Sequence, residues 1–584
     1  MLHAEGPLLT IDVSERTATR IDIDGVLERY IGGRGVATAL AHDRIPFDAD
    51  PFGPENRVYL ATGPLQLSTT SFTGRMSMTG LSPLTDGLAS TNAGGYLSRE
   101  FADTGISTLE VVGESDELLV VHVTDEGVEF ETVPELAEAT VPEVSEHVAD
   151  SRGLGPEHCV AIGPAGENLV RFASVMTFDS RAFGRGGLGA VLGSKKVKAI
   201  TFEGDARPAN DADESVASDS GGSAAIEIPD PPATEIHREA ATSDDIKKRQ
   251  GTTSNTESIN ENFSLPTRYF EEYEFEHAAD IGGNAVEAKK YKKETCSQCA
   301  YACKLPTRDE AEGVETEGPE FETVYAFGSS QGVGDIVDVM KANELCDTLG
   351  MDTISAGVTV AAYLKSEGEF GNAELARDVT ERIAYREDGD NLAELLAGGV
   401  HRAHEALGVD DYTVKGMEFA AHDGRVLHGQ GLSYAVANRG GDHMYAGMLG
   451  PEYNGDIDPQ GTLGKAELLV ELENRNAIRD SAIVCAFAGD YVTDDRLATL
   501  LDCSYEDLLA IGAETIERER HFNNRRGTDA DDDGLPYDLP DLEAAISEYY
   551  ETRGLRQDGT IPSDRIDTVA IDLDGTDDVS PADD

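Results

Sequence analysis

The sequence predicts an α+β protein of several domains, in which a strand-rich N-terminal domain precedes two mainly α-helical domains. Its 584 residues exceed what one compact core usually accommodates. Apolar and polar residues alternate early in the chain, and helical periodicity dominates later. We expect a β-rich domain at residues 1–203, an acidic linker or insertion at 204–235, helical domains at 236–415 and 416–570, and an acidic tail at 571–584.

Hydrophobic periodicity and composition predict the individual elements. Alternating segments predict strands at Val58–Leu60, Leu109–Val112, Leu118–Val123 and Lys198–Phe202. The linker is rich in Asp, Glu, Ser, Ala and Pro, a composition that does not pack into a core. Beyond it, apolar residues recur on neighbouring helical turns at Asp335–Leu349, Asp352–Leu364 and Lys465–Arg479. The final residues read as a frayed tail.

The charge balance restricts the partners. Lys and Arg total 47 against 111 Asp and Glu, a net charge of −64. Nucleic acids and anionic membranes repel such a chain, so we expect neither as a partner. The 39% hydrophobic content indicates a globular protein with carboxylates on its solvated faces, as in high-salt organisms. No apolar run reaches membrane-spanning length and the start lacks a signal-peptide pattern, so we expect a cytoplasmic, halophilic protein.

Three cysteines form the sharpest motif. Cys296, Cys299 and Cys303 make a C-x2-C-x3-C run, whose thiolates can surround one metal centre. An iron–sulfur cubane needs a fourth thiolate, which leaves the choice of Cys159, Cys346, Cys485 or Cys503. Zinc is the alternative, but its sites usually come as two separate pairs of ligands. The spacing favours iron–sulfur.

Two similar turns follow predicted helices. Asp347-Thr-Leu-Gly-Met-Asp352 places Gly350 at a helix C-cap and Asp352 at the next N-cap. Asp347 then opposes the helix dipole, by roughly 0.3–1 kcal/mol, so another contact must hold it. Asp480-Ser-Ala-Ile-Val-Cys485 has the same spacing, which makes Cys485 the natural fourth ligand. The two carboxylates suit the N–H groups of a fused heterocycle, one on each side of a metal centre.

Two glycine-rich stretches suit phosphate binding. Residues 90–98 and 183–190 each read as a loop that opens a helix, where free backbone N–H groups attract an anion. The candidate residues are Asn92, Gly94 and Gly95 in the first stretch, and Arg185 and Gly186 in the second. Arg185 has the geometry to hold a phosphate in a bidentate manner.

Taken together, the cysteine run, the paired Asp turns and these loops resemble the aldehyde ferredoxin oxidoreductase family, from about residue 5 to about residue 540. Its members hold a tungsten bis-pterin beside a [4Fe–4S] cluster. The resemblance implies that the N-terminal domain cradles the pterins, that Asn92 positions a bridging Mg²⁺, and that Arg75 lies between cluster and pterin. It also assigns pterin contacts to Asp347, Asp352, Asp480 and Val484, and cluster ligation to Cys296, Cys299, Cys303 and Cys485.

The resemblance further implies oxidation of a small aldehyde to a carboxylic acid, with electrons passing through the cluster to ferredoxin. Glu322, in a G-P-E-F-E-T segment, is the expected base and Glu320 the second choice. Their i, i+2 spacing points them in different directions on a helix. His443 matches the residue beside the metal. We expect the partner ferredoxin to be acidic as well. Its docking would then depend on salt screening of the repulsion between the two proteins rather than on attraction between opposite charges.

The chain also departs from the family pattern. Ile483 and Val484 stand where Gly-Leu is usual, so we expect a different or strained backbone. Some family members bind an iron between two subunits through an E-x-x-H motif in the helix that matches residues 335–349. This chain lacks the motif there, so we expect no such iron, and a homodimer held together by it is not supported. One alternative is a molybdenum-containing or carboxylate- or acyl-CoA-reducing relative. Another is a non-catalytic, metal-stabilised scaffold. Cys159 and Cys503 receive no role, and Cys346 reads as a core thiol.

Overall fold

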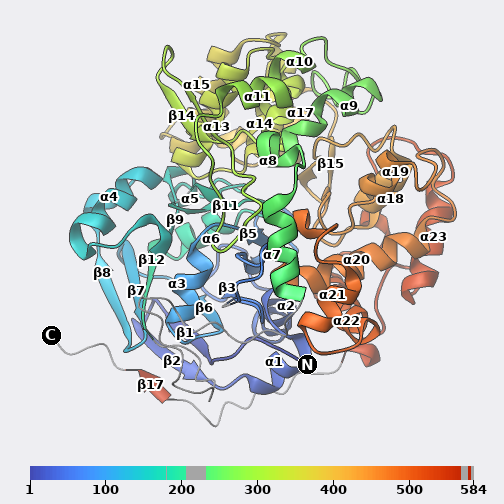
Figure 1. Ribbon diagram of the computed structural model, residues 1–584. Coiled ribbons are helices and arrows are strands. Elements are labelled where there is room, and N and C mark those ends of the chain that lie inside the picture. The colour runs from blue at the N-terminus through green and yellow to red at the C-terminus, as the bar shows by residue number, and fades with distance from the viewer. Residues whose placement is uncertain (67, 179, 206–231, 567–576, 580–584) are drawn as a thin grey trace.

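The computed structural model describes residues 1–66, 68–178, 180–205, 232–566 and 577–579. The predicted strand-rich and helical parts are confirmed: two sheets occupy the N-terminal part, and helices dominate from residue 232 onward (Figure 1). Most of the predicted linker lies outside the described residues, and its last residues begin α7 (Pro232–Thr242). In the predicted tail, β17 (Asp577–Val579) pairs with β2 rather than fraying.

The first sheet has seven strands in the order β17-β2-β1-β6-β3-β4-β5 among the described residues. β1 and β6 are parallel, and the other neighbours are antiparallel. Its strands are β1 (Leu8–Asp12), β2 (Thr17–Ile21), β3 (Val58–Ala61), β4 (Met76–Leu81), β5 (Leu88–Ala93), β6 (Thr108–Val112) and β17. Both faces are covered: Val58 and Leu60 face the second sheet, whereas Tyr59 and Ala61 face helices. This alternation is what the sequence pattern predicts.

The second sheet follows the order β11-β10-β9-β12-β7-β8, with β12 and β7 parallel. Its strands are β7 (Leu119–Thr124), β8 (Val128–Thr132), β9 (Cys159–Ala161), β10 (Val175–Thr177), β11 (Arg181–Phe183) and β12 (Val197–Glu203). Leu119, Val121 and Ile200 share one core with the first sheet. The accompanying helices are α1 (Asp24–Tyr30), α2 (Gly33–Arg44), α3 (Leu97–Asp103), α4 (Val141–Arg152), α5 (Pro164–Glu167) and α6 (Leu188–Ser194).

The middle part of the chain, apart from α7, lies above the sheets in Figure 1 and packs around α12, α13 and α14, whereas α7 runs down in front and packs on the last part of the chain. Its helices are α7, α8 (Lys247–Gln250), α9 (Thr256–Glu261), α10 (Ala278–Ile281), α11 (Gly283–Lys289), α12 (Phe321–Phe327), α13 (Ile336–Leu349), α14 (Thr353–Glu367), α15 (Ala373–Tyr385), α16 (Asn391–Leu396) and α17 (Val400–Leu407). Two short hairpins join them: β13 (Pro306–Asp309) with β14 (Val314–Glu317), and β15 (Thr413–Val414) with β16 (Met417–Glu418).

The last part lies beside the others, at the right of Figure 1. It comprises α18 (His428–Val436), α19 (Leu449–Asn454), α20 (Ala466–Ser481), α21 (Asp494–Leu500), α22 (Tyr505–Arg525) and α23 (Leu542–Arg553). α20 and α22 pack on α2, which joins this part to the first sheet. Within the described ranges, no helix combines the length and apolar character needed to cross a membrane.

Candidate active site

The two Asp turns form at the ends of α13 and α20. α13 stops at Gly350, which adopts a left-handed φ of 74°, and Asp352 caps α14 by accepting from the N–H groups of Ile354 and Ser355. At the second turn Ile483 takes the place of Gly350 and adopts a φ of 58°. A β-branched residue in that region costs roughly 1–2 kcal/mol. The strain expected from the sequence is therefore confirmed.

Close packing holds the second turn in place. The Ile483 side chain is fully buried, and an added Cβ on Gly63 would stand 2.8 Å from its Cγ1. The Val484 N–H donates to the Arg479 carbonyl at 2.8 Å, and the Cys485 N–H donates to the Phe72 carbonyl at 2.8 Å. Cys485 is thereby fixed against the segment that precedes β4.

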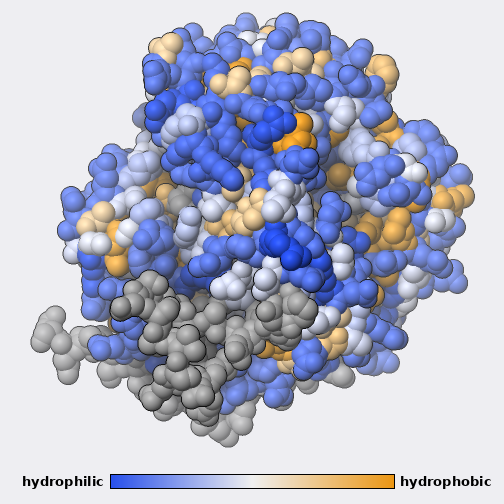
Figure 2. Space-filling model, viewed as in Figure 1, coloured by the Kyte–Doolittle hydropathy of each residue, from blue (hydrophilic) through white to orange (hydrophobic). Residues whose placement is uncertain are grey.

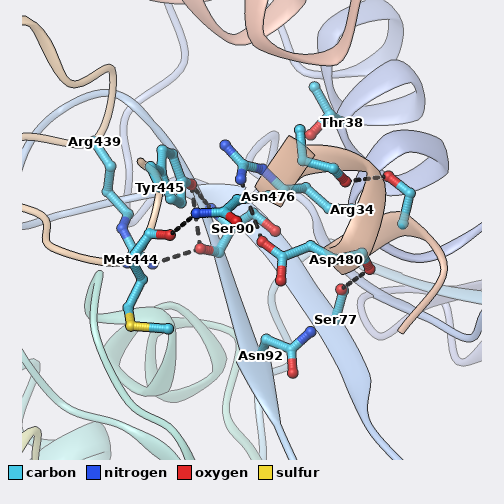
Figure 3. Close-up of polar contacts among 12 residues, drawn as sticks. Arg34, Thr38, Ser77, Ser90, Asn92, Arg439, Met444, Tyr445, Asn476 and Asp480 are labelled. Carbon is cyan, nitrogen blue, oxygen red and sulfur yellow. Dashed lines mark hydrogen bonds and ion pairs between the residues drawn. The ribbon is translucent and has the colours of Figure 1, made fainter. Parts of the chain in front are cut away.

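Asp480 is held from the N-terminal domain. Arg34, fully buried in the first turn of α2, reaches its carboxylate at 3.3 Å and binds Glu519 at 2.8 and 2.9 Å. Gly33 must lack a side chain, because its φ is 43° and a Cβ would lie 2.3 Å from the Asp480 carbonyl oxygen. The Gly32–Gly35 segment thus forms the turn into α2. Figure 3 shows Asp480 between Arg34 and Asn92.

Asn92 lies on β5, and Arg75 immediately precedes the neighbouring strand β4. The Arg75 guanidinium donates to the side-chain and backbone oxygens of Asn92, whereas the buried Asn92 Nδ2 has no partner within the described residues. Residues 90–93 belong to β5 rather than to the predicted loop, and the helix α3 begins only at Leu97. A Cβ on Gly94 would meet the Cys296 Sγ at 3.1 Å and the Arg75 Nη1 at 3.3 Å. Gly94 therefore lets the thiol and the guanidinium approach each other.

The loop that carries Cys296, Cys299 and Cys303 packs against the segment Gly94–Gly95. The Ser297 N–H donates to the Gly95 carbonyl at 2.9 Å, and Gln298 and Ala302 both adopt positive φ, so the loop turns sharply between its cysteines. Burial raises the pKa values of the Cys299 and Cys303 thiols, and the neighbouring Cys485 and Cys296 thiols raise them further.

Among the remaining cysteines, Cys159 and Cys346 belong to separate hydrophobic cores. Cys503 borders the same core as Cys485, but its charged neighbours are Asp502, Asp507 and the N-terminal amine rather than other thiols. The structure therefore brings Cys485, and none of these, to the run. In the described ranges, no three His, Cys, Asp or Glu side chains converge on a point for one metal ion.

Arg181, which the sequence reasoning missed, joins the cysteines to the first Asp turn. It lies near the Cys296 and Cys303 thiols and binds Glu317 at 2.9 Å and Glu320 at 3.3 Å. Asn343 donates to the Asp347 carboxylate at 3.1 Å, which supplies the contact that Asp347 required. Burial and the neighbouring Glu317 raise the pKa of Asp347.

Glu322 lies in the first turn of α12, and its carboxylate lies between the side chains of two histidines. Its Oε1 is 3.3 Å from the His443 Nε2 and 3.4 Å from the His422 Nε2, and its Oε2 accepts from the Ala421 N–H at 2.9 Å. Burial alone would raise the pKa of Glu322, but the two histidines and that N–H lower it to about 2. Burial lowers the pKa of His443 against the attraction of Glu322. Glu322 is therefore ionised at neutral pH.

Glu320 points the other way, as its spacing from Glu322 predicts. It precedes α12 and accepts from the Thr252 hydroxyl at 2.6 Å and from Arg181. His422 was missed because it belongs to no motif and lies 100 residues beyond Glu322 in the chain. A second sequence-derived residue, Arg185, binds the Asp352 carboxylate and the carbonyls of Glu418 and Gly441, so a phosphate grip by Arg185 stays a prediction.

Several of these side chains face internal space. Asp480, Glu322 and His443 lie deep in the protein, yet their side chains remain 31%, 18% and 12% accessible. The buried His443 Nδ1 has no hydrogen-bond partner among the described residues. A buried polar atom without a partner, in a side chain that borders the same space as two carboxylates, fits a polar group bound nearby.

Stacked and ionic contacts connect the two sides of this space. Arg34 and Arg439 flank the Tyr445 ring at 3.6 and 4.5 Å, and Arg439 pairs with Asp442, the residue before His443. Figure 3 also shows Arg439 and Tyr445 meeting the backbone of Ser90 on β5. The Asp480 turn and the Glu322 site thus belong to one connected structure.

The fold and site define a protein with partly accessible buried carboxylates and an imidazole between a two-sheet domain and two helical parts, beside four cysteines. Residues 8–204 match the family model described as the aldehyde ferredoxin oxidoreductase N-terminal domain, and residues 233–571 match the model of its domains 2 and 3. The chain belongs to the aldehyde ferredoxin oxidoreductase family and is an enzyme of that family.

Curated relatives extend over almost the whole chain. The tungsten-containing aldehyde ferredoxin oxidoreductase of Thermococcus kodakarensis is 34% identical, with 93% of this chain and 95% of that protein covered. The Pyrococcus furiosus protein of the same description is 32% identical at the same coverage. Among solved structures, the active-site complex BamBC of benzoyl coenzyme A reductase superposes with a TM-score of 0.79 at 19% identity, covering 97% of both chains.

Proposed function

We propose that this enzyme oxidises an aldehyde with water to a carboxylic acid, releasing two protons and two electrons. The observation that carries the proposal is Glu322, ionised between His422 and His443 and facing an internal space bounded by the family's cofactor turns. The homologous tungsten-containing enzymes, which cover 93% of the chain, support the same reaction class.

The residues present fit a tungsten bis-pterin and a [4Fe–4S] cluster. Asp347 and Asp480 would offer carboxylates to the pterins, with Asp352 and Val484 in the adjoining turns. Asn92 would position the Mg²⁺ of the pterin phosphates, with its Nδ2–H, which has no partner within the described residues, donating to a phosphate oxygen. Gly94, Gly95 and Gly186 give these groups close access to the backbone. When bound, the tungsten centre supplies oxygen transfer and accepts the substrate's two electrons, while the protein supplies positioning and electrostatics.

The geometry favours His443 as the proton acceptor. With its Nε2–H directed at the Glu322 carboxylate, the neutral imidazole leaves Nδ1 as an acceptor without a partner within the described residues. Glu322, with its pKa of about 2, is a weak base at neutral pH and instead holds the tautomer and orientation of the ring. The proposed base is therefore His443, whereas the sequence predicted Glu322 in that role.

The four cysteines would hold an iron–sulfur cluster, which would supply an exit for electrons. Cys296, Cys299, Cys303 and Cys485 would each bind one iron of the cubane, and Arg75 and Arg181 would place positive charge beside it. A ferredoxin would then take the electrons one at a time. Positive charge next to the cluster stabilises its reduced form.

The test is metal content combined with turnover, on protein purified without air from cells grown with tungstate. We expect tungsten with about four irons per chain, and dye reduction that requires an aldehyde and yields one carboxylate per two electrons. Turnover of acyl-CoA or carboxylate in place of aldehydes would establish the alternative activity. Zinc without tungsten, molybdenum or turnover would establish a scaffold and contradict the proposal.

A further inference from the structure

The lysines of this acidic chain are unevenly distributed. It has 14 lysines, and seven of them lie in the 58 residues that lead into and contain the cysteine run. These seven are Lys247, Lys248, Lys289, Lys290, Lys292, Lys293 and Lys304. Positive charge therefore gathers next to the predicted cluster, in a chain whose acidic groups outnumber basic ones by 111 to 47.

A surface hollow of about 660 Å³ brings much of this charge together, where α8 meets the end of α11 (Figure 1). Figure 2 shows the same face as mainly hydrophilic. Three of the charged groups that line the hollow are acidic: Asp244, Asp245 and Glu287. Five are basic, which reverses the chain's average. We call these five the basic rim: Lys248, Arg249, Lys290, Lys292 and Lys293.

The basic rim lies beside the cysteines. Lys248 is near the Cys299 thiol, and its Nζ is 5.9 Å from the ring of Tyr301, which lies between the second and third cysteines of the run. Lys290 is near the Cys303 thiol and donates to the Lys248 carbonyl at 3.1 Å. The four cysteines of the predicted cluster are only partly buried. A partner on this face would therefore approach the cluster closely.

The outer members of the basic rim are available to a partner. Arg249 and Lys292 are 61% and 47% accessible, although each also pairs with a carboxylate, Glu287 at 2.8 Å and Glu294 at 2.5 Å. Lys293 is exposed, and no ion pair joins it to any described residue. Exposed pairs of this kind contribute little energy and exchange partners readily.

We propose that the basic rim is the docking surface for a small acidic redox protein, which accepts electrons from the cluster. The proposal rests on the proposed function only in requiring that the four cysteines hold a redox cluster. Each transfer moves one electron from the reduced cluster to the oxidised partner, and no bond forms or breaks. The cluster is oxidised and the partner reduced.

Electrostatic range explains why a strongly negative protein can attract an acidic partner here. At about 0.1 M salt the Debye length is about 10 Å, so most of the net charge of −64 is screened at the point of contact. Charges at the interface itself are screened least. The local excess of basic groups then steers the encounter, so docking uses attraction rather than screening alone.

The test uses holoenzyme reduced with dithionite, so that aldehyde turnover is not needed. Stopped-flow measurements follow electron transfer to a small acidic ferredoxin, to a basic cytochrome c and to a small neutral dye, at about 0.1 M and about 1 M salt. The variant is Lys292→Glu/Lys293→Glu. The control is Lys196→Glu/Arg556→Glu, which changes total charge equally away from the basic rim. Lys292→Gln/Lys293→Gln gives a milder change.

We expect the glutamate pair to lower the second-order rate with ferredoxin at least tenfold at about 0.1 M salt, and much less at about 1 M. The rate with cytochrome c should rise, and the rate with the dye should stay unchanged. With ferredoxin, the rate of the glutamine pair should lie between the rates of the wild type and the glutamate pair. The control variant should have the wild-type rate. Equal rates in variant and wild type, or an equal loss in the control, would overturn the proposal. So would a chain that binds no iron.

Failure of the proposed function has a different signature. An enzyme that transfers electrons from dithionite to ferredoxin through the basic rim, but never oxidises aldehydes, would keep the docking proposal and lose the reaction. An enzyme that oxidises aldehydes with the dye, and reduces ferredoxin equally in all variants, would keep the reaction and lose the docking proposal. Iron content and the visible spectrum confirm that each variant is correctly assembled.

Discussion

Replacing Glu322 by Gln tests the proton path directly. The substitution keeps the size of the side chain but removes its negative charge. In the wild type the Glu322 Oε1 lies 3.3 Å from the Nε2 of His443 and 3.4 Å from the Nε2 of His422. A unit charge pair at 3.3 Å contributes about 5 kcal/mol at an effective dielectric constant of about 20. Glu322 raises the pKa of His443, so the pKa of His443 must fall when the carboxylate is removed.

The assay is the pH dependence of kcat/KM for aldehyde oxidation with a small dye. We expect Glu322→Gln to lower kcat/KM by roughly 10²–10⁴ and to move the acidic limb of the profile about one to three pH units lower. The limb moves to lower pH because His443 must be deprotonated to accept a proton. Glu320→Gln is the matched control, and its profile should keep its shape.

Three results would refute this reasoning in different ways. An acidic limb that stays in place while kcat/KM falls would make Glu322 itself the base. Undiminished turnover would exclude both roles. A larger loss in Glu320→Gln than in Glu322→Gln would move the chemistry to the Arg181 side of α12.

The same substitution affects stability. Glu322 has a pKa of about 2 against an ordinary 4.5, a difference worth about 3 kcal/mol. A lowered carboxyl pKa stabilises the fold fully above pH 4.5, and this contribution disappears as the pH falls toward 2. The contribution of the Glu322 carboxylate to the stability difference between wild type and Glu322→Gln should therefore shrink as the pH falls from 4.5 toward 2. A thermal unfolding series over that range checks it.

Three further predictions concern the neighbouring residues. Cys485→Ser should remove the visible absorption of the cluster and lower the iron content, whereas Cys503→Ser should change neither; equal iron in both variants would contradict the ligand assignment. Ile483→Gly should be more stable to heat than Ile483→Ala by roughly 1 kcal/mol, the reverse of the usual order, because Gly adopts the φ of 58° without strain. A lower midpoint for the Gly variant would contradict a strained turn. His422→Gln should lower kcat/KM about tenfold and move the acidic limb upward, because the interaction with His422 lowers the pKa of His443; turnover and profile identical to wild type would limit His422 to packing.

Sequence patterns predicted what depends on local order. The alternation at Val58–Leu60 places one set of residues against the second sheet, and β3 does so. Repetition of the Asp-to-sixth-residue spacing selected Cys485 from four candidates, and the structure brings this cysteine to the run. The unusual Ile483 indicated backbone strain before any dihedral angle was known.

Contacts between distant segments were beyond the same reasoning. His422 reaches Glu322 only because the segment after β16 folds onto α12, and no spacing in the chain records that approach. Arg181 sits in a short strand without a distinctive motif, yet it joins the cysteine loop to the Asp347 turn. For Arg185, a glycine-rich context suggested a phosphate; in the structure its guanidinium binds three protein oxygens, and the phosphate contact stays a prediction.

The buried pair of Arg34 and Glu519 joins residues 485 positions apart in the chain. Both side chains are almost inaccessible, so loss of either partner leaves an uncompensated charge, at a cost of about 3–5 kcal/mol. Since Arg34 also binds Asp480, the first turn of α2 and the helix α22 jointly hold the Asp480 turn in place. These contacts are complete only once α22 has been synthesised. If the chain binds pterins as proposed, a truncated chain that ends before α22 should bind them poorly even with every glycine-rich turn intact.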